Sequence, residues 1–218
     1  MTGGAPTDVR PPRARVIKSS EFRRMRWKNG GGETIEIAIS PQHATVDNFD
    51  WRISMAQVES DGSFSTFGGV DRSLAILRGS GIALTIESRS AIETTRLSPP
   101  LSFDASAATW ARLLDGPVVD LNVMTRRGRY SHRMRRIASQ EQAVIETSAR
   151  QKHLLAWDGA ITIETRDGPF SLESGDVLCA YEVCPPWRLS LGSASVGYLV
   201  EIFDAGGQSQ VRSAETED

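Results

Sequence analysis

Short segments in which apolar and polar residues alternate are the feature that most constrains the fold of this chain. Residues 34–40 place three isoleucines on one face, and residues 49–58 place Phe49, Trp51, Ile53 and Met55 on one face. A period of two is the period of a β-strand. Turn-forming residues separate these segments, and few helical patterns interrupt them, so the sequence predicts an all-β sandwich or barrel. Further strands are predicted at residues 74–77, 82–86, 118–124 and at several places within 151–203.

Two local patterns lead to more specific expectations. Residues 78–81, which read Arg-Gly-Ser-Gly, lie between two apolar segments and predict a hairpin turn. Residues 110–114 predict a short helical turn that ends at Asp115-Gly116-Pro117. Residues 1–15 and 205–218 are rich in polar residues and glycine and predict disordered tails.

The chain contains an internal echo. Residues 74–87 and 154–164 both have an apolar segment, a glycine turn, a second apolar segment and a final Thr-Ile-Glu. Two β-hairpins can resemble each other by chance, and the alternative is a duplicated unit. A duplication predicts two small β-barrels packed side by side, at residues 16–125 and 126–204, and closure of the barrels would remove exposed strand edges.

Composition excludes several classes of protein. The 218 residues carry a formal net charge of −2 with a pI near 6.0, and a general nucleic-acid binder would show a basic excess. No apolar run approaches the roughly 20 residues that cross a bilayer. Residues 1–15 lack the apolar segment of a signal peptide. We therefore expect a cytoplasmic protein that binds neither nucleic acid nor membrane.

The cysteines and histidines do not form a metal-binding pattern. Cys179 and Cys184 are too far apart for a C-x-x-C motif, and His43, His132 and His153 are scattered along the chain. Because no H-x-H or H-x-x-x-H pair is present, we predict no metal and no cofactor.

A glycine triplet at residues 30–32 follows Trp27, Lys28 and Asn29 and precedes the strand at 34–40. Three adjacent glycines suggest positive φ or a close approach that leaves no room for a Cβ. One interpretation is a flexible connecting loop. The other is a ligand-facing turn in which Lys28 supplies charge and Asn29 supplies hydrogen bonds. A phosphate-binding P-loop fits poorly, because its lysine follows the last glycine.

Charged side chains on otherwise apolar strands are the other candidates for chemistry. Arg52 is either a solvated edge residue or a cation in a pocket, and periodicity alone does not decide. Asp120 and Asn122 share a face of the predicted strand at 118–124. Arg126 ends that strand, where it could clamp a carboxylate through two parallel hydrogen bonds. The sequence shows no nucleophilic triad.

Several motifs in order resemble the HutD/Ves family. They are residues 27–34, 49–54, 61–65, 71–72, and 115–117 together with 120–124. The resemblance implies a bicupin, with two cupin-type β-barrels in one chain, and an association with bacterial histidine utilisation. It also implies binding of a pathway intermediate, such as formiminoglutamate or urocanate, that restrains the pathway, without an established enzymatic activity. The chain departs from the family pattern at residues 67–69 and 103–106, and it lacks the cupin His-x-His motif.

Three functional hypotheses follow. The first is a non-catalytic module that binds a small acidic metabolite. The second is a metal-independent isomerase or hydrolase with Glu36 or Asp120 as the base, and the third is an interaction protein, for which a homodimer is one expected assembly. The residues expected to bind the ligand are Trp27, Lys28, Asn29, Glu36, Arg52, Asp71, Arg72, Asp120, Asn122 and Arg126.

Overall fold

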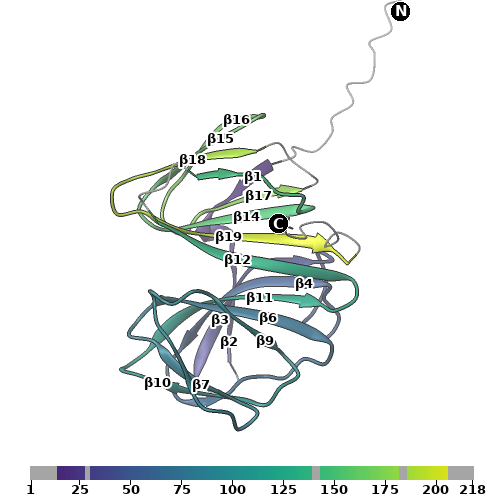
Figure 1. Ribbon diagram of the computed structural model, residues 1–218, viewed down its shortest axis with the longest axis vertical. Coiled ribbons are helices and arrows are strands. Elements are labelled where there is room, and N and C mark those ends of the chain that lie inside the picture. Colours follow the sequence, from purple (N-terminus) through teal and green to yellow (C-terminus); the bar gives the residue numbers. More distant parts are fainter. Residues whose placement is uncertain (1–13, 28–29, 139–142, 182–185, 206–218) are drawn as a thin grey trace, which may run out of the picture.

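The structure, a computed structural model, describes residues 14–27, 30–138, 143–181 and 186–205 (Figure 1). Within these ranges the chain forms nineteen strands and one 3₁₀ turn, η1 (Ser19–Glu21). All pairings between strands are antiparallel, which confirms the all-β prediction. No helix in the described part of the chain could cross a bilayer.

The strands form four sheets that pack as two sandwiches. The N-terminal sandwich is made of a six-stranded sheet and a four-stranded sheet. In spatial order the six-stranded sheet contains β2 (Arg23–Arg26), β3 (Gly32–Ser40), β4 (Trp51–Val58), β11 (Val118–Arg126), β6 (Val70–Arg78) and β9 (Leu101–Asp104). The four-stranded sheet contains β5 (Gly62–Ser63), β10 (Thr109–Leu113), β7 (Ile82–Ile86) and β8 (Ile92–Thr94).

The C-terminal sandwich pairs a five-stranded sheet with a second four-stranded sheet. The five-stranded sheet contains β1 (Ala14–Ile17), β17 (Val177–Tyr181), β14 (Gln151–Asp158), β19 (Val196–Asp204) and β12 (Tyr130–Ala138). Its partner sheet contains β13 (Ala143–Ile145), β18 (Trp187–Leu191), β15 (Ile161–Thr165) and β16 (Gly168–Leu172). The first strand of the described chain thus lies in a sheet whose other strands come from the C-terminal half, and Figure 1 shows β1 among the green and yellow strands.

Alternation along the strands decides which side chains enter which core. Leu121 and Val123 on β11 lie in a central apolar core, together with Leu155 on β14 and Val200 on β19. This core joins the six-stranded sheet to the five-stranded sheet. The intervening residues of β11 point to the opposite side, into the N-terminal sandwich. The polar face of β11 is therefore enclosed between the two sheets of that sandwich.

The structure departs from the sequence prediction at two strands. A helical turn is expected at residues 110–114, but residues 109–113 form β10, because this segment pairs with β7 on one side and β5 on the other. The predicted hairpin at 78–81 is wrong: β6 pairs with β11 and β9, whereas β7 pairs with β10 and β8. The glycine turn carries the chain from the six-stranded sheet, which is the inner sheet because it packs against the other sandwich, to the four-stranded outer sheet.

The echo in the sequence corresponds to equivalent crossings. The β6–β7 connection and the β14–β15 connection each pass from the inner sheet to the outer sheet of their sandwich. At both turns a glycine is required by close approach, since a Cβ on Gly79 would lie 2.5 Å from the Pro117 carbonyl oxygen and one on Gly159 would lie 2.4 Å from Ser195 Oγ. The two sandwiches thus share a connection, but closed barrels are not confirmed, because the described strands form four separate open sheets.

The ends of the chain are only partly described. Ala14 and Arg15, expected in the N-terminal tail, begin β1 and pair with β17. The rest of both predicted tails, residues 1–13 and 206–218, lies outside the described residues. The division of the chain into units at residue 125 stays a prediction.

Candidate functional site

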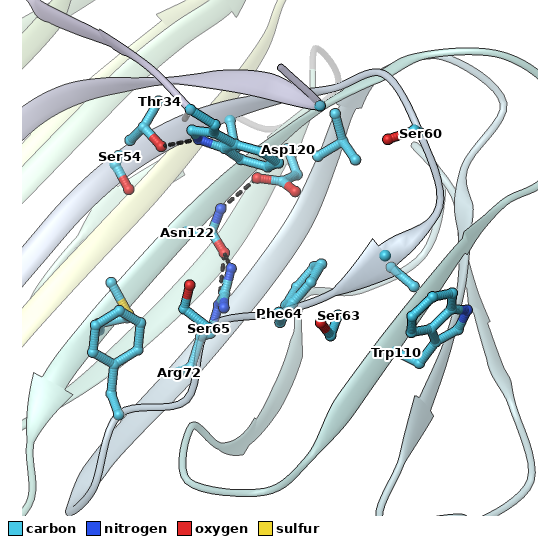
Figure 2. A pocket seen from close by; sticks show the side chains of 18 of the residues that line it. Thr34, Ser54, Ser60, Ser63, Phe64, Ser65, Arg72, Trp110, Asp120 and Asn122 are labelled. Atoms are coloured by element: carbon cyan, nitrogen blue, oxygen red, sulfur yellow. Dashed lines mark hydrogen bonds between the residues drawn. The ribbon is translucent and has the colours of Figure 1, made fainter. Parts of the chain in front are cut away.

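A cavity of about 540 Å³ lies inside the N-terminal sandwich, between the polar face of the six-stranded sheet, β10 and the segment 60–67. Its volume falls in the range of small-molecule sites, roughly 300–1,000 Å³. Figure 2 shows that its polar side chains come from both the sheet and this segment. The cavity therefore has the size and the mixed lining of a ligand site.

Strand register brings the charged side chains together. Asn122 and Met124 on β11 lie opposite Ser54 and Arg52 on β4, and Met124 also lies opposite Arg72 on β6. Because residues two apart share a face, Asp120 joins the same surface. All six residues line the cavity.

A hydrogen-bonded chain links three of these residues across two strands. Arg72 Nε donates to Asn122 Oδ1 at 2.8 Å, and Arg72 Nη2 donates to the same oxygen. Asn122 Nδ2 donates to Asp120 Oδ1, and Figure 2 shows the three side chains in sequence. The amide has one orientation in this chain, because a guanidinium only donates and an ionised carboxylate only accepts.

Burial sets the charges in this chain. Asp120 and Asn122 are buried. Loss of water raises the pKa of Asp120 to about 6, against the opposing effects of Arg72 and the Asn122 hydrogen bond. Burial lowers the pKa of Arg72 to about 10, although Asp120 opposes that change. At neutral pH both groups are therefore mostly ionised, and the pKa of Asp120 lies about one unit below neutral pH.

A second arginine lies on the neighbouring strand. Arg52 Nε donates to Glu36 Oε2 at 2.8 Å, and the two side chains are only 7% and 10% exposed. Glu36 does not line the cavity, and it lies behind Arg52 as its counter-charge. The structure thus decides the question that periodicity leaves open: Arg52 is a buried cation at the cavity wall.

Aromatic rings complete the lining. The Phe64 ring lies against the Arg72 guanidinium, 4.3 Å from its Cζ to the ring centroid. The Trp27 indole donates to Thr34 Oγ1 at 2.8 Å, which fixes the ring at the cavity wall. Because the ring quadrupole attracts a cation that lies over its face, Phe64 helps to hold the Arg72 guanidinium at the cavity wall.

The structure separates the predicted site residues into groups. Trp27, Arg52, Arg72, Asp120 and Asn122 line the cavity, and Glu36 supports it through Arg52. Lys28 and Asn29 lie outside the described residues.

Asp71 and Arg126 lie away from the cavity. Alternation turns Asp71 to the face opposite its neighbour Arg72, where it pairs with Arg127 at 2.6 Å on an exposed surface. Arg126 Nε donates to the Phe49 carbonyl oxygen at 3.1 Å. The side chain of Arg126 therefore binds the backbone before β4 and does not line the cavity.

The glycine triplet has two structural roles. Gly31 lines the cavity. Gly32 begins β3, and a Cβ there would lie 2.0 Å from the Gln57 carbonyl oxygen and 3.2 Å from the Trp27 ring. A tight start to the strand therefore requires Gly32, and the same packing positions Trp27.

Sequence reasoning missed a part of the lining. Ser54, Ser63, Phe64, Ser65 and Trp110 contribute to the cavity. Ser54 shares the polar face of β4 with Arg52, so alternation alone could have found it. Residues 63–65 belong to a motif that carries the family resemblance, but a loop offers no periodicity from which to place side chains.

The residues present do not fit the metal site of a cupin. In the described part of the chain, no group of three His, Cys, Asp or Glu side chains could hold a metal ion. His132 and His153 instead lie in other contacts. His132 Nε2 lies 2.8 Å from Ser73 Oγ, and His153 Nδ1 lies 3.1 Å from Cys179 Sγ.

Comparison with known proteins agrees with the motifs. The model of the HutD family matches residues 19–195. An uncharacterised 21.2 kDa protein in the hutC 3′ region of Pseudomonas putida is 35% identical over 124 residues, which is 55% of this chain and 62% of the relative. Protein Ves of Citrobacter koseri is 40% identical over 111 residues, which is 50% of this chain and 56% of the relative. Each match thus spans less than two thirds of the relative.

Solved structures share the fold over most of the chain. A conserved protein of unknown function from Pseudomonas aeruginosa PAO1 has a TM-score of 0.82 at 27% identity, covering 87% of this chain and 98% of that one. HutD from Pseudomonas fluorescens SBW25 has a TM-score of 0.74 at 24% identity, covering 88% and 98%. A Lactobacillus farciminis oxalate decarboxylase has a TM-score of 0.59 at 10% identity, covering 86% and 85%, and shows a likeness of fold alone.

Proposed function

The chain belongs to the HutD family, and from this membership we propose that it binds a small acidic metabolite of histidine degradation, such as formiminoglutamate or urocanate, and thereby modulates histidine utilisation. The named relatives support this proposal: one is encoded beside hutC and another is called HutD. We also propose that the two sandwiches are a duplicated pair of cupin-like units.

One observation carries the proposal: the buried Arg52 and the partly buried Arg72 face the same cavity with unused donors. Arg52 uses Nε on Glu36, and Arg72 uses Nε and Nη2 on Asn122. Among the described residues, their other guanidinium N–H groups have no hydrogen-bond partner. Charge-assisted bonds to a carboxylate are strong in a water-poor site, so a planar acid is a suitable ligand.

The apolar lining suits the body of such a ligand. Phe64 and Trp27 flank the charged groups and offer flat surfaces to a short carbon chain or a ring. In this proposal Lys28 and Asn29, next to Trp27 in the chain, stay predicted contacts to the ligand.

Calorimetry with formiminoglutamate, urocanate and glutamate tests the proposal. We expect heat of binding with at least one of them, and a loss of affinity of tenfold or more in Arg52→Ala. Arg126→Ala is the matched control, since it removes an arginine that does not line the cavity, and it should bind like the unaltered protein. Absence of heat with every ligand at millimolar protein would remove the proposed ligand class.

A second candidate function is metal-independent catalysis on a small carboxylate. The observation that favours it is Asp120, whose pKa of about 6 suits a general base at neutral pH. Incubation with the same metabolites, followed by NMR, separates the two. Conversion that is lost in Asp120→Asn supports catalysis, and unchanged spectra support binding alone.

A further inference from the structure

One carboxylate oxygen in the cavity has no partner. Asp120 is 1% exposed, and its Oδ1 accepts from Asn122. Its Oδ2 is buried and has no hydrogen-bond partner among the described residues. A buried acceptor that is left unpaired costs free energy, and native structures keep few of them. Such an atom at a cavity wall marks a place where a donor belongs.

The surroundings do not supply that donor. Alternation along the neighbouring strands puts Ala56, opposite Asp120 on β4, and Thr34 on the same face. The Thr34 hydroxyl accepts from the Trp27 indole, and its own O–H makes no hydrogen bond to Asp120 Oδ2. Arg72, the cation that acts on Asp120 electrostatically, reaches it through Asn122 rather than directly. A hydrogen bond from the Ala56 backbone also lowers the pKa of the Asp120 carboxyl. Because Oδ2 has no hydrogen-bond partner among the described residues, one oxygen of this carboxylate is left unused.

The cavity thus offers two kinds of unused group. Arg52 and Arg72 have spare N–H donors, and Asp120 has a spare acceptor. A ligand that carries only carboxylates would satisfy the arginines and leave Asp120 unpaired beside a like charge. A ligand with an acidic end and an N–H end would satisfy both.

We propose that this cavity selects acids that also carry an N–H donor, such as an ammonium, amidinium or imidazole group, and that Asp120 Oδ2 accepts the hydrogen bond from it. The inference rests on the proposed function, because the carboxylate end is held by the same arginines. It narrows the ligand from small acids in general to acids with a nitrogen at the opposite end.

The selectivity follows from the cost of the missing bond. A site built to hydrogen-bond a polar group rejects an analogue that lacks the group, because the site's own polar atom is left buried and unpaired. A hydrogen bond to a charged group is worth enough to change affinity by about tenfold or more. Carboxylate recognition alone gives no such preference.

Matched pairs of ligands test the inference on the full chain. Urocanate and 3-(2-furyl)acrylate share a planar ring and an acrylate, and only urocanate has a ring N–H. Glutamate and glutarate share two carboxylates, and only glutamate has an ammonium group. Calorimetry at neutral pH should show that the nitrogen-bearing member of at least one pair binds about tenfold more tightly than its partner.

The Asp120→Asn variant gives a second readout. Its side-chain oxygen must still accept from Asn122, so its amide nitrogen would replace the free acceptor with a donor. The preference for the nitrogen-bearing ligand should then disappear or reverse, in a variant whose thermal unfolding shows that it is folded. If the variant does not fold, the ligand pairs on the unaltered protein decide.

The outcomes distinguish the two proposals. Equal affinity for both members of each pair would overturn the role of Asp120 and leave the binding of acids intact. No binding of any of the four ligands or of formiminoglutamate would overturn both. A preference that persists in Asp120→Asn would assign the discrimination to another residue and overturn the inference.

Discussion

Acidification should destabilise this protein, because the buried His153 and the partly buried His132 are both held in the neutral form. Burial lowers the pKa of His132 to about 4 and that of His153 to about 3. His132 lies between Ser73 and Thr125, and His153 lies between Cys179 and the Trp51 ring, whose centroid is 5.3 Å away. Neither position offers an anion in hydrogen-bond contact that would stabilise an imidazolium.

The sign follows from where protons bind. In the unfolded chain both histidines take up a proton near pH 6.5, whereas in the folded chain they resist it, so stability present above pH 6.5 is lost as the pH falls. Between pH 7 and pH 5 each histidine should cost about 2 kcal/mol.

Asp120 acts in the opposite direction. Its folded pKa of about 6 lies above the ordinary value, so the folded chain binds its proton first and gains about 1 kcal/mol at pH 5 relative to pH 7. The lowered pKa of Glu201 acts below about pH 4.5 and contributes little in this window. The net expectation is a loss of about 2–3 kcal/mol.

Urea denaturation followed by tryptophan fluorescence at pH 7, 6 and 5 measures this loss. Asp120→Asn removes the opposing group, so the loss between pH 7 and pH 5 should grow by about 1 kcal/mol in that variant. A free energy of unfolding that is equal or higher at pH 5 would refute the argument that both histidines are held in the neutral form.

Three further expectations concern packing. Gly32→Ala should destabilise by about 3 kcal/mol, because its Cβ would overlap the Gln57 carbonyl oxygen, whereas Gly68→Ala, where a Cβ meets nothing within 4 Å, should change stability by less than about 0.5 kcal/mol in the same urea assay. Asn122→Leu should cost about 2–4 kcal/mol in thermal or urea unfolding, since it removes the amide that joins the buried Asp120 to the partly buried Arg72, and an unchanged stability would contradict the hydrogen-bonded chain. Trp157→Phe should cost about 1–2 kcal/mol, because the indole donates to the Leu77 carbonyl oxygen at 2.8 Å between the sandwiches, and a neutral effect would show that this bond adds nothing.

Alternation along strands predicted much of the site from sequence. It placed Asp120 and Asn122 on one face of a strand. It left open whether Arg52 is a solvated edge residue or a cation in a pocket, and the pairing of β4 with β11 decides for the pocket. The same rule could have excluded Asp71, which adjoins Arg72 and must face the other way. Alternation with period two places side chains only within a strand. Phe64 lies in a loop, so its position at the cavity could not be predicted in this way.

Long-range pairing explains what local patterns could not predict. The sequence around Gly79 has the glycines of a hairpin turn, yet β6 and β7 lie in different sheets. β6 pairs with β11, and β7 pairs with β10. Both partners are distant in sequence, so the residues around the turn do not predict these pairings. Residues 109–113 form a strand for the same reason, because they pair with an edge of β7 that is distant in sequence.

The two sandwiches differ in how their interior charges are satisfied, and this difference bears on binding stoichiometry. When the alignment of residues 74–87 with 154–164 is extended by two residues toward the N-terminus, Arg72 corresponds to Lys152. Arg72 lies opposite Met124 on β11, but Lys152 lies opposite Glu201 on β19. Glu201 is fully buried, and Arg133 binds it at 2.7 and 2.9 Å.

In the C-terminal sandwich the chain thus supplies its own carboxylate, Glu201, at the position where we propose that an acid from outside binds the arginines of the N-terminal sandwich. A duplicated architecture would ordinarily suggest two equivalents of ligand per chain. Here the internal acid makes the second position self-satisfied, and a titration should saturate at one equivalent.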